Sequence, residues 1–143
     1  MKKVILLLSL LLLFLVSCSK TTINAKMYQL KDWEYTEKVD DYKYEILDTY
    51  SDYETSKNMP NLKAYEEDYF KNSSLIIIYL RDSTYGNSYE LKEACKINDE
   101  LKIRMERVFE GLGQSFSTTA YCIEVESKNI SMVEVNRVKM NQE

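Results

Sequence analysis

The sequence predicts an α+β fold, a mainly antiparallel β-sheet in a sandwich or an open barrel, with one or two short helices before the central strand. Apolar and polar residues alternate along several segments between Tyr42 and Met140, which is the period of a half-buried strand. The run Leu75–Leu80 is uniformly apolar and rich in isoleucine, which is typical of a strand buried on both faces. Helical periodicity is confined to residues 51–70, which places the helices before that run.

The earliest strand is predicted at Tyr42–Leu47, where aromatic or aliphatic residues alternate with charged ones. Trp33–Tyr35 is a candidate partner strand across a turn at Asp40 and Asp41. The uniformly apolar run Leu75–Leu80 should then occupy the centre of the sheet.

Two short helices are predicted between these strands. Ser51 and Glu54 match a capping box with Ser51 as the N-cap, and this helix should end before Pro60 because the residue before a proline disfavours helical angles. A second helix fits Leu62–Phe70. Its apolar stripe consists of Leu62, Tyr65 and Tyr69. The acidic residues 66–68 would then form a solvated face rather than a cation site, because adjacent helical residues do not converge on one ion.

A β-hairpin is predicted in the second half of the chain. Thr84–Asn87 forms a turn or loop, and Ser88–Ile97 and Leu101–Phe109 then alternate on either side of a tight turn at Asn98–Glu100. The residues expected to face the core are Tyr89, Leu91, Cys95 and Ile97 in the first strand and Leu101, Ile103, Met105 and Phe109 in the second.

Two further strands follow the hairpin. Gly111–Ser115 is interpreted as a plain loop, since it lacks the lysine and hydroxyl ending of a phosphate-binding P-loop. Thr118–Glu126 is predicted to be a strand, and its expected inward side chains are Tyr121, Ile123 and Val125. Met132–Met140 is predicted to be the last strand, with a bulge near Asn136 because the apolar parity shifts there.

The N-terminus has the layout of a bacterial export signal. Basic residues in Met1–Lys3 precede the apolar run Val4–Val16, which is short for a membrane-spanning helix, and small Ser17 precedes Cys18. Residues 15–18 (LVSC) resemble a lipobox, in which the cysteine receives a diacylglyceryl group and becomes the new N-terminus. The resemblance implies a lipoprotein held at the extracytoplasmic side of the cell membrane through Cys18. An uncleaved anchor or an ordinary signal peptide are the alternatives.

The domain organisation follows from this N-terminus. Residues 1–17 are the predicted signal peptide, 18–27 a flexible tether, and 28–143 a single β-rich domain. Removal of the signal takes away Lys2 and Lys3, so the formal net charge falls from −4 to −6. An acidic chain lacks the basic footprint of nucleic-acid binding.

Residue types also exclude several chemistries. The sequence has no histidine, which excludes hydrolases with a histidine base and the common zinc sites. We therefore expect no cofactor, no metal ligand and no catalytic residue. Strand parity places Cys95 toward the core and Cys122 on the opposite face of its strand, where a helix is a candidate cover, so both thiols are predicted free. A bulge that resets one strand would allow a disulfide instead.

The order of elements carries a second resemblance. The aromatic and acidic segment Tyr65–Phe70 before the strand Leu75–Leu80 resembles small lipoproteins of unknown function from low-GC Gram-positive bacteria. The turn and strand at Thr84–Glu90, the hairpin, the glycine loop and Tyr121–Glu126 are similar to the C-terminal domain of PrcB-type protease-complex subunits. This resemblance implies a non-catalytic β-rich domain and names no active residue.

Two function classes fit these observations. The first is a non-enzymatic binding domain whose partner is an envelope protein or polymer, with exposed members of its 12 tyrosines as contact groups. The alternative is a small carboxylate-dependent envelope hydrolase, which needs two acids that flank a cleft.

Overall fold

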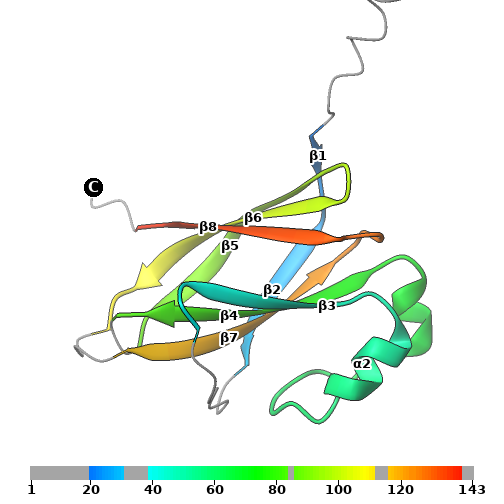
Figure 1. Cartoon of the computed structure of the whole chain (residues 1–143), viewed down its shortest axis with the longest axis horizontal. Coiled ribbons are helices and arrows are strands. Elements are labelled where there is room, and N and C mark those ends of the chain that lie inside the picture. The colour runs from blue at the N-terminus through cyan, green and yellow to red at the C-terminus, as the bar shows by residue number, and fades with distance from the viewer. Residues whose placement is uncertain (1–19, 31–38, 84–85, 112–115, 140–143) are drawn as a thin grey trace, which may run out of the picture.

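The computed structural model describes residues 20–30, 39–83, 86–111 and 116–139. These residues form two four-stranded sheets that share one hydrophobic core, and a helical layer covers the other face of one sheet (Figure 1). The predicted fold class is confirmed, in its sandwich form.

The two sheets differ in how they are covered. The outer sheet has the strand order β1 (Thr21–Thr22), β5 (Ser88–Ile97), β6 (Glu100–Phe109) and β8 (Met132–Val138). The central sheet, which lies between the outer sheet and the helical layer, has the order β2 (Ala25–Leu30), β7 (Ser117–Val125), β4 (Ser74–Asp82) and β3 (Tyr42–Leu47). Neighbouring strands are antiparallel except for β6 and β8, which are parallel.

Strand β4 is buried on both faces, as its uniformly apolar sequence predicted. Every side chain of Leu75–Leu80 is at most 1% exposed. The even-numbered side chains pack in the core between the sheets, and the odd-numbered ones pack beneath the helical layer. Removing a leucine- or isoleucine-sized side chain from water contributes about 1.5–3 kcal/mol, so this strand is a major source of stability.

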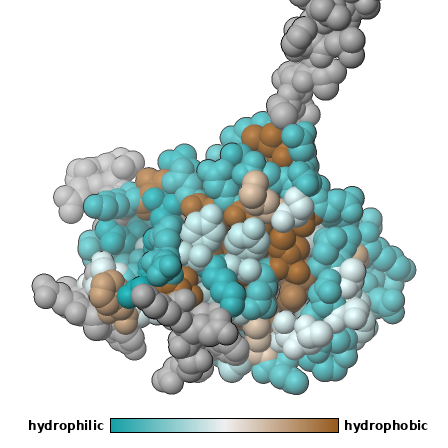
Figure 2. Space-filling view, viewed as in Figure 1, coloured by the Kyte–Doolittle hydropathy of each residue, from teal (hydrophilic) through white to brown (hydrophobic). Residues whose placement is uncertain are grey.

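The predicted inward residues of β7 also lie in the core between the sheets. They meet Leu101, Ile103 and Met105 of β6 there, whereas Phe109, at the end of β6, is 57% exposed and does not face the core as expected. Figure 2 shows a largely hydrophilic surface with an apolar stripe between β8 and β3, where the two edge strands leave the core partly open.

Helix α2 (Tyr50–Ser56) begins two residues earlier than predicted. Its N-cap is Thr49, not Ser51, and its capping box pairs Thr49 with Asp52 rather than Ser51 with Glu54. The Asp52 amide donates to Thr49 Oγ1 at 3.1 Å, and the Thr49 amide donates to Asp52 Oδ2 at 2.9 Å. Both pairs have the capping-box spacing, and the structure uses the one that directly follows β3. The helix ends before Pro60, as predicted.

The helix predicted at Leu62–Phe70 is wrong over most of its length. Residues 62–66 have no regular secondary structure, and only the 3₁₀ helix η1 (Glu67–Lys71) is helical. Tyrosine hydroxyls replace the missing helical hydrogen bonds, because the amide of Lys63 donates to the Tyr28 hydroxyl and that of Tyr65 to the Tyr53 hydroxyl, both at 3.3 Å. The three stripe residues still pack against one cluster, and the acids at 66–68 are exposed as expected.

The β5–β6 hairpin is confirmed, but β5 contains a bulge that the sequence pattern hid. Leu91 pairs with Met105 and Glu93 with Arg104, so Lys92 is an extra residue. Ala94 therefore packs in the core between the sheets, and Cys95 lies on the opposite face, paired with Lys102. The prediction that Cys95 points into the core is wrong for this reason.

Strand β8 has no bulge at Asn136. Its register with β6 is unbroken from Met132 to Val138, and the parity shift has another cause. Val133, Val135 and Arg137 occupy alternate positions on one face, and the Arg137 side chain reaches carbonyl and carboxylate oxygens of β4. A polar residue at an inward position, rather than an inserted residue, interrupts the apolar pattern.

The N-terminal tether is shorter than predicted. Residues 21–22 and 25–27, assigned to the tether at 18–27, belong to β1 and β2. The candidate strand Trp33–Tyr35 and most of the glycine loop at 111–115 lie outside the described residues. Within the described ranges, no helix is long and apolar enough to span a membrane.

With Thr49 rather than Ser51 as the N-cap of α2, alanine substitutions at the two positions should affect stability differently. Thr49→Ala should lower the free energy of unfolding by about 1 kcal/mol, because it removes the acceptor of the Asp52 amide. Ser51→Ala is the matched control and should change stability by less than about 0.5 kcal/mol. Urea denaturation of both variants measures this difference, and a larger loss for the Ser51 variant would restore the original capping box.

Candidate functional site

Strand β5 runs the length of the sandwich and defines its two ends. At one end, which we call the β1 end, Thr21 pairs with Lys96 of β5; at the other, the distal end, Ser88 of β5 pairs with Phe109. The 10 residues of β5 separate the two ends. At about 3.3 Å per residue, the separation is about 30 Å.

Cys18 lies outside the described residues, but the length of the chain limits its position. It precedes Thr21, the first residue of β1, by three positions. Three residues span at most about 11 Å, so Cys18 is confined to the neighbourhood of the β1 end.

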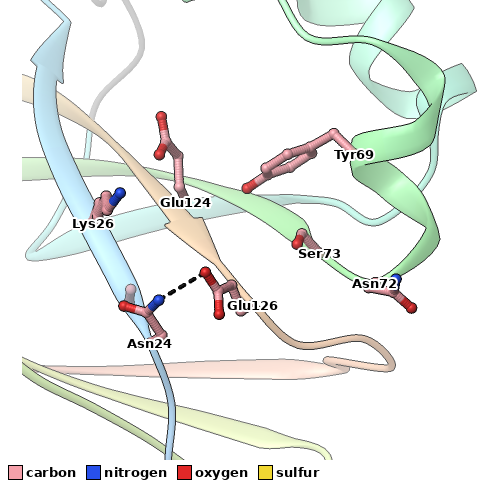
Figure 3. Close-up of a pocket in the computed structure, with 8 residues that line it drawn as sticks. Asn24, Lys26, Tyr69, Asn72, Ser73, Glu124 and Glu126 are labelled. Atoms are coloured by element: carbon pink, nitrogen blue, oxygen red, sulfur yellow. Dashed lines mark hydrogen bonds between the residues drawn. The ribbon is translucent and has the colours of Figure 1, made fainter.

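A polar cavity of about 510 Å³ opens at the β1 end (Figure 3). Glu124 lies near the end of β7 (Ser117–Val125) and Glu126 directly follows that strand, and Tyr69 faces them from the helical layer. Asn24 Nδ2 donates to Glu126 Oε1 at 2.7 Å. Glu124 Oε1 accepts from Lys63 Nζ and from the Tyr65 hydroxyl, each at 2.8 Å. Both carboxylates thus already have protein partners.

The electrostatics of this cavity do not suit acid catalysis. Partial burial acts to raise the pKa of Glu124, but the hydrogen bonds from Lys63 and Tyr65 outweigh it and hold the pKa below its usual value. The general acid of a glycosidase needs a raised pKa. In the described part of the chain, every carboxyl group with a shifted pKa has it lowered.

The tyrosine hydroxyls near this cavity join the helical layer to the central sheet. The hydroxyls of Tyr28 on β2 and Tyr65 in the layer lie 3.1 Å apart, and burial raises the pKa of both. Cys122 lies fully buried in the same cluster beneath the layer, on the face that strand parity predicted. Burial raises the pKa of the Cys122 thiol to about 12.

A buried polar cluster links the two sheets at the distal end. Asp82 of β4 is only 7% exposed, and its Oδ1 accepts from the Tyr89 hydroxyl at 2.7 Å and from Arg137 Nη1 at 3.3 Å. Arg137 Nη1 also donates to the Arg81 carbonyl at 2.9 Å, and Nη2 pairs with Asp41. The second carboxylate oxygen of Asp82, Oδ2, has no hydrogen-bond partner among the described residues.

This cluster forms one wall of a cavity of about 370 Å³, the distal pocket. Its lining residues are Asp40, Asp41, Arg81, Asp82, Ser83, Phe116 and Arg137. Phe116 is 70% exposed, and the guanidinium carbon of Arg81 lies 4.3 Å above the centre of its ring. Val108 and Phe109 are exposed at the same end of the sandwich.

The exposed aromatic residues are phenylalanines rather than the tyrosines that the sequence analysis expected as contact groups. None of the ten tyrosines in the described ranges is classed as exposed, so their main role there is packing. The large aromatic residues that the structure exposes are Phe109 and Phe116, and sequence reasoning singled out neither as a contact group. It also missed Asp82, Arg81 and Arg137, for which the only local signal was the break in the alternation of β8.

Comparison with known proteins found no match: no family model, no curated protein and no solved structure is similar to the chain. The described residues also contain no group of three or more histidine, cysteine or acidic side chains that could hold a metal ion.

The thiols of Cys95 and Cys122 give a chemical test of how strands β5 and β7 are oriented, because a disulfide would require the two side chains to face each other. Both are free and buried in the structure. Protein purified without reductant should show titratable thiols at both Cys95 and Cys122 in denaturant, and neither should react in the folded state at pH 8, because burial protects both and raises the pKa of Cys122 to about 12. Cys122→Ser, as a control, should leave one thiol. A mass lower by two hydrogens, with no thiol in denaturant, would mean that a disulfide exists.

Proposed function

We propose that the chain is a lipoprotein anchored to the extracytoplasmic side of the cell membrane through diacylglyceryl-Cys18, and that its sandwich is a non-enzymatic binding domain. The observation that carries the proposal is the position of Cys18, three residues before the first strand at one end of the molecule. The exposed aromatic residues lie at the opposite end.

The lipid supplies the membrane affinity in this proposal. Each buried methylene contributes about 0.8 kcal/mol, and two acyl chains hold a protein stably where one holds it marginally. The acidic mature chain gains nothing from anionic headgroups, so its charge adds no second attachment.

The short connection also orients the domain. Because Cys18 lies within about 11 Å of Thr21, the β1 end is held at the membrane surface. The distal end then lies about 30 Å farther out and is accessible to a partner in the envelope. Aromatic and arginine side chains such as Phe116 and Arg81 are the types enriched in binding interfaces, which favours an envelope protein or polymer as the partner.

The hydrolase alternative is less well supported. Glu124 and Glu126 are the two carboxylates that share a cavity at the β1 end, but they lie two residues apart at the end of β7 rather than on opposite walls, and each is bonded to a protein side chain. The lowered pKa of Glu124 keeps it ionised at neutral pH, when a general acid must carry a proton. The resemblance to the PrcB-type C-terminal domain likewise implies a non-catalytic role.

The anchor is tested by substitution of its cysteine. Cys18→Ala should abolish incorporation of labelled fatty acid, and the protein should keep its signal peptide or leak into the medium, because the thiol that carries the lipid is gone. Cys95→Ala, the same chemical change at a buried site in β5, should leave the labelling unchanged. Equal labelling of the Cys18 variant and the unsubstituted protein would rule out the proposal.

A further inference from the structure

Strand β3 is an open edge of the central sheet. It stands at the end of the strand order and pairs with β4 alone among the described strands. The Arg81 amide of β4 donates to the Asp41 carbonyl at 3.0 Å, so residues 41 and 81 form a hydrogen-bonded pair. Bonded and non-bonded pairs alternate in an antiparallel ladder. The amides and carbonyls of Tyr42, Tyr44 and Ile46 therefore point away from β4, toward the open edge.

The same three residues are the apolar part of this edge. Their side chains pack against the core between the sheets but are only half-buried, as is that of Val135 on β8. We call these four residues the seam, and Figure 2 shows the apolar stripe between the two strands. Proteins commonly protect an edge with a proline or a bulge, but β3 has no proline and keeps an unbroken register with β4. An added strand would thus gain free backbone groups and apolar contact together.

The other face of β3 carries one charge of each sign. Lys43 and Glu45 alternate with the seam residues, so their side chains point to the opposite face of the sheet. An added strand would meet them at its non-hydrogen-bonded positions, where the side chains of neighbouring strands are closest. A complementary antiparallel strand therefore has a base opposite Glu45 and an acid opposite Lys43. From its own N-terminus, its order is apolar, basic, apolar, acidic, apolar.

We propose that β3 binds an extended segment of a polypeptide partner, which adds antiparallel to the free edge and carries this charge order. The proposal rests on the binding function proposed above and names the class of partner. An extended polypeptide presents amide and carbonyl groups at the two-residue repeat of β3, which a sugar polymer does not. The seam begins beside Asp41, which lines the distal pocket, so it continues from the end of the domain that faces away from the membrane.

A second copy of this chain is a less suitable partner, although its own β3 has the required order. Residues 42–46 read Tyr-Lys-Tyr-Glu-Ile. Strand β3 runs from the distal pocket to Leu47, whose partner Leu75 pairs with Glu124 of the β1-end cavity. Copies anchored through Cys18 in one membrane would all hold β3 in this direction, so two of them cannot pair antiparallel. The β3 sequence instead supplies a probe.

The test is a hydrogen-exchange titration by NMR of the full lipidated chain in detergent micelles. The probe is the capped peptide DYKYEILD, which copies residues 41–48, and the comparison peptide DYEYKILD exchanges its lysine and glutamate. The probe should bind saturably and slow amide exchange at Tyr42, Tyr44 and Ile46. The amides of Lys43 and Glu45 should change little, because they already bond to β4. The exchanged peptide should bind about three- to tenfold more weakly, since it sets like charges opposite each other.

Two double variants test the charge order. Lys43→Glu with Glu45→Lys should reverse the preference, so that DYEYKILD binds about three- to tenfold more tightly than DYKYEILD. The matched control is Lys102→Glu with Glu134→Lys, which exchanges an ion pair of 2.6 Å on the outer sheet. This control should keep the preference of the unsubstituted chain.

Two N-methylated forms of the probe test the backbone pairing. The amide of its central tyrosine lies opposite Tyr44 and faces β3, so methylation there should abolish binding. The amide of its lysine faces away from β3, so methylation there should be tolerated. Equal effects of the two methyl groups would contradict the proposed register.

Other outcomes would also overturn the inference: equal binding of the two peptides, tighter binding of DYEYKILD by the unsubstituted chain, or no saturable protection. Protection of Tyr42, Tyr44 and Ile46 that rises with protein concentration in the absence of peptide would identify a second copy as the occupant instead. Fatty-acid labelling at Cys18 is read independently. Labelled protein that binds neither peptide would remove only the strand-addition inference. Unlabelled protein that gives the expected exchange pattern would remove the anchor and leave the edge.

Discussion

The burial of the central sheet on both faces is the constraint on which the rest of the structure depends. The apolar run Leu75–Leu80 has no polar face, so the outer sheet must cover one side of β4 and a second layer the other. One short helix, a 3₁₀ turn and an irregular segment make that second layer, and hydrogen bonds of the Tyr28 hydroxyl attach it to the sheet. The same arrangement buries Cys122 beneath the layer. It also brings Lys63 and Tyr65 within hydrogen-bond distance of Glu124, and these bonds make the β1-end cavity poorly suited to acid catalysis.

Local patterns in the sequence predict most of the strands but not how they are joined. Alternation located β3, the β5–β6 hairpin and β7, because each has one face in the core. It failed where a single residue changes the parity: Lys92 is an extra residue in β5, and Arg137 is a polar residue at an inward position of β8. The parallel pairing of β6 with β8 has no local signature, since it depends on a connection that crosses the sandwich. The apolar spacing of the segment after Pro60 predicts a helix, yet its amides at Lys63 and Tyr65 bond to tyrosine hydroxyls and residues 62–66 form no helix.

The candidate site was less predictable than the fold. Cys18 could be proposed as a lipid attachment site from sequence alone, because the residues that resemble a lipobox are contiguous. The distal pocket joins Asp41, Asp82 and Arg137, whose separations in sequence conceal their contact, and its exposed aromatic residue is Phe116 rather than one of the abundant tyrosines. The pocket also depends on hydrogen bonds between the two sheets, in which Tyr89 and Arg137 of the outer sheet donate to Asp82 of the central sheet. We therefore propose that the membrane attachment lies at one end of the sandwich and the recognition surface at the other.

The orientation of the domain on the membrane tests that account most directly. Bimane labels on Thr22→Cys at the β1 end and on Ser83→Cys at the distal end, in protein reconstituted into vesicles with nitroxide-labelled lipids, report the depth of each end. Both positions are exposed, and the native Cys95 and Cys122 are buried, so the labels should be specific. The account predicts strong quenching at position 22, which lies within about 14 Å of Cys18, and little at position 83. Equal quenching at both positions, or stronger quenching at position 83, would contradict it.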